Sequence, residues 1–296
     1  MIMGQSNNKQ ALMKQQQNKI NNMAFSQFMS ADSVKRRISS VLGGDKGQRF
    51  IASIVSAVMN NSTLQECTND SIFSGALLGE SLNLSPSPQL GHFYLVPFNV
   101  KTKVVDENGK EKDKWVKQAQ FQLGYKGYLQ LAIRSGYYTK INVLDIKEGE
   151  LIKYDPLNEE IEVNLIEDEE VRENAQTVGY YAMFEYKNGF RKSIYWSKTK
   201  MENHAKKYSQ GYKSDLEKGT KYTFWSKDFD GMAFKTMLRQ LISKWGIMSI
   251  ELQNAIENDM AVITSDGKEY VDNPTNEPPK PQPEIIEAKE VSIDEL

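Results

Sequence analysis

The sequence predicts an α+β protein in which antiparallel β-hairpins pack on helices to form a single core domain. Apolar residues recur at helical spacing up to about residue 85, the period then changes to strand-like alternation, and both ends of the chain are polar. We expect residues 1–30 to form a flexible N-terminal arm and residues 31–257 to form the core. Residues 258–296 are acidic and Pro-rich, which predicts a disordered tail that docks a partner.

Three helices are predicted at the start of the core. The segment ADSVKRRISSVLGG offers Asp32 or Ser33 as an N-cap, apolar residues at helical spacing, and two glycines as a stop. RFIASIVSAVMNN repeats the helical period. NDSIFSGALLGESLNLSPSP predicts a third helix, which ends before Pro86 and Pro88 because proline cannot continue a helix.

A β-hairpin is predicted next, because residues 91–105 and 115–123 both alternate and DENGKEKDK separates them. Lys101 and Lys103 share one face of the first strand. Lys117 shares a face of the second strand with several apolar residues. We therefore expect a hairpin that is buried on one side and partly basic on the other.

The segment QFQLGYKGYLQLAIRSGYY predicts a helix with one basic stripe. Lys126, Gln130 and Arg134 lie four residues apart, so they share one face, and the opposite face carries Leu129, Ala132 and Ile133. Gly124 and Gly127 also suggest a phosphate loop, but the Gly-x-x-x-x-Gly-Lys-Ser/Thr spacing is absent from the chain. ATP hydrolysis is therefore not expected.

The rest of the core alternates between predicted strands and helices. Strands are expected at YTKINVLDI, EIEVNLI, TVGYYAMFEYK and FRKSIYW, and Asn188-Gly189 joins the last two as a tight turn. Ser197 then caps a short basic helix. A long helix over residues 228–245 is apolar around most of its surface, including Trp245, and polar only along Lys235, Thr236, Arg239 and Ser243. We expect this helix to be largely buried.

Charge is segregated along the chain. Residues 258–296 hold ten acidic and three basic residues, and residues 145–173 hold twelve acidic and three basic residues. The remaining chain has 31 basic against 17 acidic residues, a balance that suits binding to a polyanion. No segment has the length of a membrane span, and a reducing, cytoplasmic setting is expected for a chain whose only cysteine is Cys67.

Several kinds of catalytic site are disfavoured. One cysteine and two histidines, His92 and His204, cannot assemble a disulfide or a Cys/His zinc cluster within one chain. The carboxylates of residues 148–170 have no accompanying base, so we interpret them as a solvated acidic face rather than as a metal-dependent nuclease site. No metal site, bound cofactor or enzymatic activity is predicted.

Cations and aromatic residues are interleaved between residues 198 and 227. Lys200, His204 and Lys207 align on one helix face, and further lysines surround them together with Tyr208, Tyr212, Tyr222, Phe224 and Trp225. A charge run alone is usually a solvated surface. Single-stranded nucleic acid, however, needs cations for its phosphates and π-faces for its bases, and this pattern offers both.

The sequence resembles the RecT family of phage single-strand annealing proteins. The residues that carry the resemblance are GHFYLVPFNVKT, FQLGYKGYLQLAIRSGYY, GYYAMFEYKNGF and FWSKDFDGMAFKTMLRQLISKWGIMS, in this order, within residues 82–249. The resemblance implies ATP-independent binding of single-stranded DNA, pairing of complementary strands into an annealed duplex, and assembly into rings or helical filaments. It also implies a prophage-encoded protein of the bacterial cytoplasm, with a phage exonuclease and the host single-strand-binding protein as partners.

The predicted DNA contacts combine the basic stripes with nearby rings. They are Lys101, Lys103, Lys117, Tyr125, Lys126, Gln130, Arg134, Lys198, Lys200, His204, Lys207, Lys221, Trp225, Lys235 and Arg239. Tyr125 could equally pack in the core, and Lys235 and Arg239 could instead pair with Asp228, Asp230 or the acidic face. Divalent metal is expected at most to assist annealing. An RNA-binding module or chaperone, and a metal-dependent nuclease, are the alternatives that the residues leave open.

Overall fold

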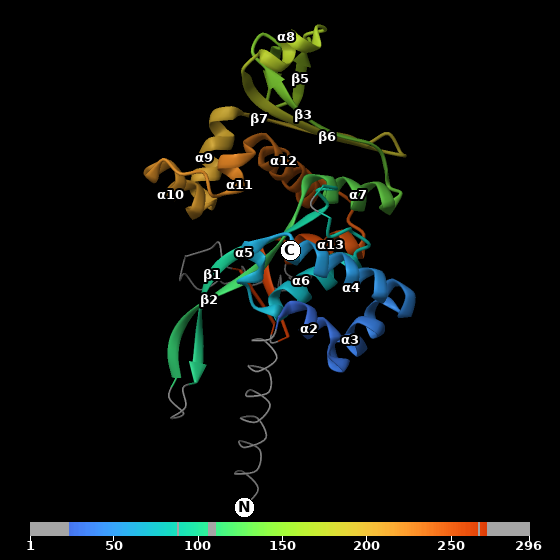
Figure 1. The fold of residues 1–296 in the computed structure, drawn as a ribbon. Helices are drawn as coiled ribbons and strands as arrows, with labels where there is room; N and C mark the ends of the chain where they lie inside the picture. Colours follow the sequence, from blue (N-terminus) through green and yellow to red (C-terminus); the bar gives the residue numbers. More distant parts are fainter. Residues whose placement is uncertain (1–23, 88, 106–110, 266, 271–296) are drawn as a thin grey trace, which may run out of the picture.

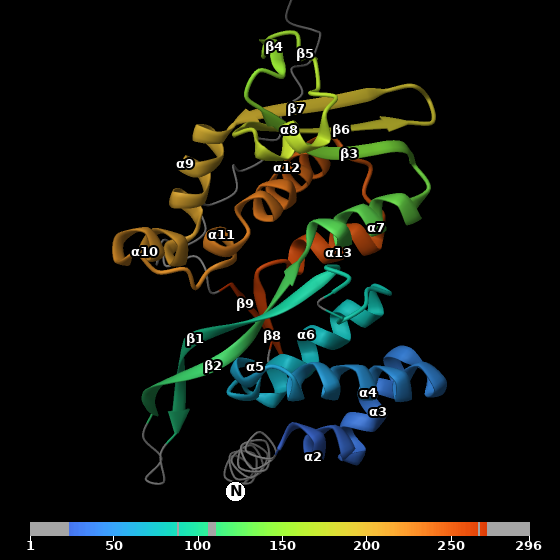
Figure 2. The same ribbon diagram turned by 45° about the horizontal axis from the view of Figure 1, so that its top comes forward.

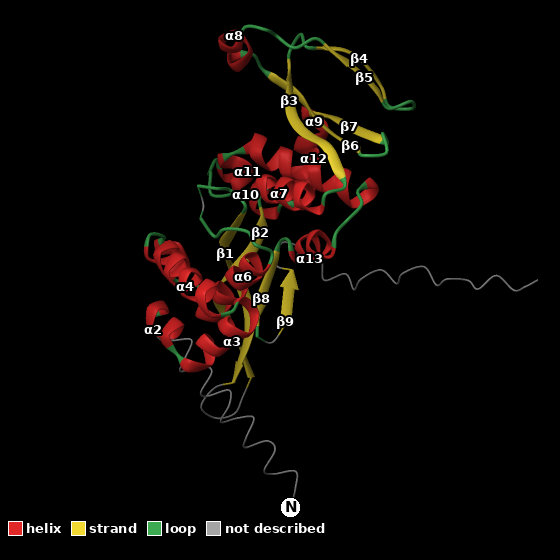
Figure 3. Cartoon of the chain, turned by 90° about the vertical axis from the view of Figure 1, so that its right-hand side faces the viewer, coloured by secondary structure: helices red, strands yellow, loops and turns green. Residues whose placement is uncertain are grey.

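The computed structural model describes residues 24–87, 89–105, 111–265 and 267–270, which form an elongated body (Figure 1). Two larger antiparallel sheets and one small hairpin are packed with helices, in agreement with the predicted α+β class. Figure 3 shows the N-terminal helices at one end and the small hairpin at the other. Residues 1–23 of the predicted arm and residues 271–296 of the predicted tail lie outside the described residues.

The N-terminal helices form a cluster with its own buried side chains. They are α2 (Phe25–Ser30), α3 (Asp32–Leu42), α4 (Gly44–Met59), α5 (Ser62–Gln65) and α6 (Asn69–Ser81). Phe28 and Met29 of α2 are buried with Ile38 and Phe50. The last residues of the predicted arm therefore belong to the fold, because their apolar side chains fill this cluster.

The first sheet contains the predicted hairpin, β1 (Phe93–Val105) and β2 (Glu111–Leu123), and has the strand order β1-β2-β8-β9. Its apolar end packs on α6 through two glycines of that helix. A Cβ on Gly79 would lie 2.3 Å from the Phe93 ring, and a Cβ on Gly75 would lie 2.8 Å from Leu95 Cδ2. Both distances are shorter than real Cβ contacts. The buried Phe93 ring therefore leaves no room for a side chain at Gly79, whereas the Leu95 methyl group beside Gly75 is the end of a flexible side chain that can move aside.

The sheet continues past residue 258, where the sequence places the start of the tail. β8 (Ala261–Thr264) pairs with β2, and β9 (Gly267–Tyr270) pairs with β8. Ala261 and Val262 are buried, and Met260 N donates to Phe121 O at 2.8 Å. Two short strands thus extend the sheet beyond residue 258: the apolar β8 contributes buried residues, whereas the polar β9 is exposed and forms the edge strand.

The second sheet has the order β3-β6-β7, formed by β3 (Tyr138–Lys147), β6 (Thr177–Tyr186) and β7 (Arg191–Ser197). The predicted Asn188-Gly189 turn joins β6 to β7, and Gly189 has φ +84°, which favours glycine. The long helix α12 (Phe229–Trp245) packs against this sheet, and α7 (Tyr125–Ser135) packs against α12. α13 (Ile250–Asn258) then leads into β8.

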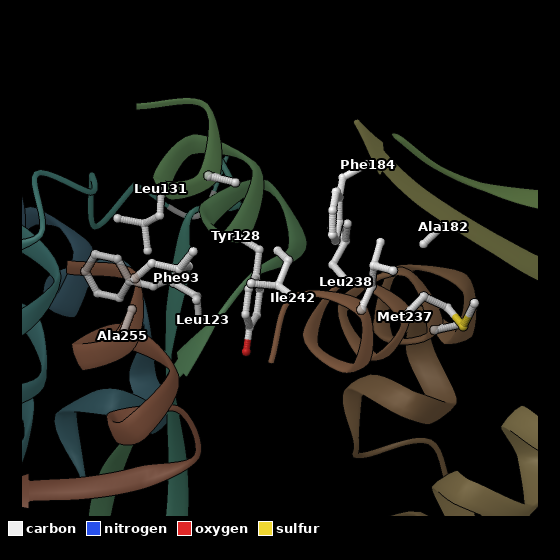
Figure 4. Close-up of a cluster of buried hydrophobic side chains, with 14 of the residues drawn as sticks. Phe93, Leu123, Tyr128, Leu131, Ala182, Phe184, Met237, Leu238, Ile242 and Ala255 are labelled. Atoms are coloured by element: carbon white, nitrogen blue, oxygen red, sulfur yellow. The ribbon is translucent and has the colours of Figure 1, made fainter. Parts of the chain in front are cut away.

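One hydrophobic cluster connects the two sheets. Figure 4 shows it extending from Phe93 and Leu123 through Tyr128 to Leu238 and Phe184. All five side chains are almost inaccessible to solvent. This cluster makes α7 and α12 the framework on which the outer helices are placed.

Two apolar residues of these helices are more exposed than predicted. Ile133 is 57% exposed, because α7 packs through Tyr128, Leu131 and Ala132 instead. Trp245 is 47% exposed, because it lies in the last turn of α12, where its ring meets Lys192 Nζ at 3.5 Å from the ring centroid. In both helices the buried apolar face is therefore narrower than the sequence pattern predicts.

A small lobe follows β3. It consists of the hairpin β4 (Leu151–Asp155) and β5 (Glu160–Val163) with α8 (Glu169–Asn174), and β4 was not predicted. Glu150 is fully buried here, and its Oε1 accepts from Arg172 Nε at 2.7 Å. Burial alone would raise the pKa of Glu150, but hydrogen bonds from the Lys147 amide and from Arg172 outweigh it and lower the pKa. The interpretation of all these carboxylates as a solvated face is therefore wrong for Glu150, whereas Glu160 and Glu162 are exposed.

Candidate nucleic-acid interface

A row of three aromatic rings begins at the end of β7 and continues on α9 (Lys198–Tyr208). The ring centroids of Trp196 and His204 are 5.3 Å apart, and those of His204 and Tyr208 are 4.6 Å apart. Because His204 and Tyr208 are four residues apart on a helix, they lie on one face. Tyr208 is 53% exposed, so this row presents aromatic surface to solvent.

Two lysines of α9 flank the row. Lys200 Nζ lies 4.5 Å from the Trp196 ring centroid, and Lys207 Nζ lies 5.1 Å from that of Tyr208. Such cation–π contacts are worth about 0.5–1 kcal/mol at exposed sites, and they hold the ammonium groups next to the rings. Cations and π-faces therefore alternate along one surface, which we call the α9 surface and define by Trp196, Lys200, His204, Lys207 and Tyr208.

Local signals explain why α9 presents this surface. The Ser197 hydroxyl accepts from Lys200 N and begins the helix, as predicted. Met201 and Ala205 are the buried residues of α9. They direct one face inward, so the basic residues are left outside: Lys200, Lys206 and Lys207 are exposed, and Lys198 is partly exposed.

A cavity of about 540 Å³ opens beside this row of rings. Trp196, His204 and Tyr208 line one side of the cavity. Lys235, Arg239 and Asp259 line it from α12 and from the segment before β8. The structure thus brings predicted contacts from two separate sequence regions, His204 with Lys235 and Arg239, to one place.

Asp259 is the residue that sequence reasoning missed at this site. Its carboxylate is fully buried and accepts four hydrogen bonds, from Lys235 Nζ at 2.9 Å, Leu123 N at 2.9 Å, Arg239 Nη1 at 2.8 Å and Tyr128 Oη at 3.0 Å. Burial, and then the Asp259 charge, raise the pKa of Tyr128 well above its ordinary value. Asp259 therefore connects α7, α12 and β2 at one point.

This network changes the interpretation of two predicted contacts. Lys235 is buried and its ammonium is held by Asp259, so it is placed beneath the surface rather than on an open groove. The Arg239 side chain is 36% exposed, and only its Nη1 has a hydrogen bond within the described residues. The pairing partner expected at the sequence level was Asp228, Asp230 or the acidic face, and the structure shows Asp259 instead.

His204, the middle ring of the row, is partly buried. Burial, together with the positive charges of Lys207 and Arg239, lowers the pKa of His204 below its ordinary value. The imidazole is therefore neutral at neutral pH. It contributes a ring surface under these conditions and a charge only in more acidic solution.

The segment after α9 is organised by a single aspartate. It contains α10 (Gln210–Lys218) and α11 (Phe224–Lys227), and Asp215 of α10 accepts from Thr220 Oγ1, Thr223 Oγ1 and Ser226 Oγ. These hydrogen bonds, the one from Thr220 first, hold the pKa of Asp215 well below its usual range. Asp215 thereby fixes the loop that carries Lys221, which is exposed.

Trp225 is placed mainly in the core. It is only 7% exposed, and its ring contacts Phe229 at 5.1 Å and Tyr212 at 6.1 Å between centroids. Trp225 is also one of the residues that line the cavity. Tyr125 is half-buried and packs edge-on against Phe234 at 5.7 Å.

The predicted stripe on α7 is exposed at Lys126, Gln130 and Arg134. α7 and α9 lie on either side of α12 in Figure 2. Arg134 also donates from Nη2 to Leu82 O at 2.7 Å and from Nη1 to Asn83 O at 3.3 Å, just beyond the end of α6. Part of its hydrogen-bonding capacity is therefore structural.

Two of the three hairpin lysines, Lys101 and Lys117, lie on one face of the hairpin. The register pairs Lys101 with Trp115 and Asn99 with Lys117, which places Lys101 and Lys117 on the same side. Lys101 Nζ forms an ion pair with Asp113 at 2.7 Å, and Lys117 pairs with Glu66. The Lys103 side chain lies outside the described part of the structure. In Figure 1 the distal part of the hairpin extends away from α7 and α9.

No metal site is found in the described part of the chain, where no group of three or more His, Cys, Asp or Glu residues could hold an ion. Cys67 is buried, and burial raises the pKa of its thiol to about 12. No helix in the described ranges is long and apolar enough to cross a membrane.

Comparison with known proteins defines the family. A sequence model of the RecT family matches residues 48–277, which include the α9 surface, the cavity and both strands after residue 258. The chain belongs to the RecT family. Family membership implies a role in single-strand annealing and recombination, and binding of single-stranded DNA.

Two relatives show how far the similarity extends. The chain is 42% identical over 229 residues to the uncharacterized protein YqaK of Bacillus subtilis (strain 168), which covers 77% of this chain and 69% of YqaK. It is 28% identical over 234 residues to protein RecT of Escherichia coli (strain K12), which covers 78% of each chain.

Proposed function

We propose that this RecT-family protein binds single-stranded DNA without ATP and promotes pairing of complementary strands during recombination of phage DNA. The observation that carries the proposal is the α9 surface, where lysines and aromatic rings alternate beside a cationic cavity. Lysines neutralise phosphates regardless of sequence, and rings stack on any base. This combination suits a protein that must accept every sequence.

Annealing requires no bond to be broken. The protein holds one strand extended, admits a second strand, and releases the paired product when pairing is correct. Base pairing supplies the discrimination, while phosphate contacts supply the affinity. Assembly into a ring or helical filament would place many such surfaces in register, so that correct pairing along neighbouring subunits accumulates.

The partners follow from the same proposal. A phage exonuclease would supply single strands by resecting duplex DNA in the bacterial cytoplasm, and the host single-strand-binding protein would cover the strand before the exchange. The acidic residues that follow Tyr270 are the proposed docking segment for such a partner. Lys126 and the hairpin lysines Lys101, Lys103 and Lys117 extend the proposed phosphate contacts beyond the α9 surface.

The test is annealing of complementary fluorescent oligonucleotides without ATP. The double variant Lys200→Gln/Lys207→Gln should anneal more slowly than the wild type. The matched control Lys153→Gln/Lys187→Gln removes two exposed lysines elsewhere and should not slow annealing. Equal rates for both variants would remove the α9 surface from the proposal. A competing RNA that displaces DNA equally well would favour an RNA-binding function, and metal-dependent cutting of labelled DNA would favour a nuclease.

A further inference from the structure

The cavity beside α9 has the size and the lining of a small-molecule site. Its volume of about 540 Å³ falls within the range of ligand pockets, roughly 300–1,000 Å³. Trp196, His204 and Tyr208 supply one aromatic wall, and Trp225 and Met232 supply further apolar surface. An aromatic wall of this kind suits a flat ring better than it suits a phosphate group.

Polar groups at the inner end of the cavity are only partly used. Lys235, Arg239 and Asp259 together carry one net positive charge, because one carboxylate pairs with two cations. Within the described residues, Nε and Nη2 of Arg239 have no hydrogen-bond partner, and the Gln240 amide, which also lines the cavity, has none. These donors can meet the ring nitrogens and carbonyl oxygens on the edge of a nucleobase.

Asp259 also makes the inner end rigid. It holds Lys235 and Arg239 through separate carboxylate oxygens and is itself fixed by Leu123 N and Tyr128 Oη. The cationic end is therefore preorganised before a ligand arrives, which lowers the ordering cost of binding.

We propose that this cavity receives one unpaired base of the bound strand while neighbouring phosphates contact Lys200 and Lys207. The inference rests on the proposed function, because it names how the same surface recognises its DNA. A base within a duplex cannot enter, since its edge is occupied by its partner base. The cavity therefore distinguishes single-stranded from paired DNA, and the base must leave when the complementary strand arrives.

Two oligonucleotides of equal charge separate a base-binding cavity from a phosphate-binding one. One is a 15-residue oligothymidylate, and the other is the same-length deoxyribose-phosphate chain without bases. The variant Gln240→Trp fills the cavity from its polar side and leaves Lys200 and Lys207 in place. It should weaken binding of the oligothymidylate roughly 5- to 160-fold, the range of one stacked base. Binding of the abasic chain should not change.

The control Lys200→Gln/Lys207→Gln should weaken binding of both oligonucleotides, because both carry phosphates. If Gln240→Trp weakens both equally, the cavity holds a phosphate, and the inference is overturned. If it weakens neither, the cavity does not contact DNA, and the inference is also overturned. A wild-type protein that binds neither oligonucleotide would instead contradict the proposed function.

A measurement on the wild-type protein avoids any dependence on the variant's folding. A single 2-aminopurine is moved through the 15-residue oligothymidylate, and quenching by acrylamide is recorded for each position in the complex. A base inside the cavity is shielded, so some positions should be quenched markedly less than their neighbours. Equal quenching at every position would overturn the inference.

Discussion

Replacing Asp259 by Asn tests the buried network at the centre of the molecule. The asparagine keeps the volume of the side chain, so no cavity is created, but it removes the charge that Lys235 and Arg239 share. Each carboxylate oxygen of Asp259 accepts from two donors, one from Lys235 and Leu123 N and the other from Arg239 and Tyr128. In asparagine one of these oxygens becomes an amide nitrogen, which is a donor, so one of the two pairs of donors loses its acceptor.

The expected cost follows from the exposure of the two cations. Removing one member of a buried ion pair costs about 3–5 kcal/mol, because the other charge is left without a partner. The Lys235 side chain is 7% exposed and should bear most of this cost, whereas Arg239 is 36% exposed and can regain water. We therefore expect a loss of about 3–5 kcal/mol in the free energy of unfolding, not twice that value.

The assay is thermal and urea unfolding followed by circular dichroism. At about 2–4 °C per kcal/mol for a chain of this size, the melting temperature should fall by roughly 6–20 °C. Glu257→Gln is the matched control, since it neutralises an exposed carboxylate two residues earlier and should change stability by no more than about 0.5 kcal/mol. Combining Asp259→Asn with Lys235→Met should recover part of the loss, because the stranded cation is gone. An Asp259→Asn protein that melts together with the wild type would refute the network.

Three further outcomes are expected. Arg134→Gln should lower the free energy of unfolding by about 1 kcal/mol, because it loses hydrogen bonds to the carbonyls after α6. Lys126→Gln should instead weaken DNA binding without changing the melting temperature. Identical melting temperatures of the two variants would show that the Arg134 contacts contribute nothing to stability. Truncation after Tyr270 keeps β9, so annealing in vitro should persist while recombination in cells falls, and equal recombination by both lengths would remove the partner-docking proposal. Burial lowers the pKa of His204, so the stability that its neutral form contributes is present above the unfolded pKa of about 6.5 and is lost as the pH falls through the folded pKa. DNA affinity should rise over the same pH range, because His204 becomes charged. The variant His204→Gln should lose both pH dependences, and titrations that do not differ from those of the wild type would assign them to other groups.

Local signals predicted most of the fold. The Asn188-Gly189 turn, the Ser197 cap and the hairpin of β1 and β2 are encoded by neighbouring residues, and the structure has each of them. The α+β class followed from the same signals. β4 has five residues and β8 and β9 have four each, so these strands are too short for alternation to identify them in the sequence.

The cavity could be predicted only in part. Its cations and rings are visible in the sequence as interleaved lysines and aromatic residues. Their arrangement around the cavity depends on Asp259, which accepts hydrogen bonds from Leu123, 136 residues away in the sequence, and from Tyr128, 131 residues away. The periodicity of apolar residues reflects local structure only, so it does not reveal hydrogen bonds between residues so far apart in the sequence. Trp225 could not be placed from the sequence for a related reason. An aromatic residue next to lysines has the same sequence pattern whether its ring faces DNA or, as for Trp225, the core.

The salt dependence of DNA binding reports how many phosphates the α9 surface contacts. For roughly four or five phosphates per protomer, the slope of log affinity against log salt concentration should be about −3, since each single-strand contact contributes about 0.7. Lys200→Gln/Lys207→Gln should make the slope shallower by about 1.4, while Lys153→Gln/Lys187→Gln should leave it unchanged. A flat dependence for the wild type, or the same slope for all three proteins, would contradict binding of single-stranded DNA on the α9 surface.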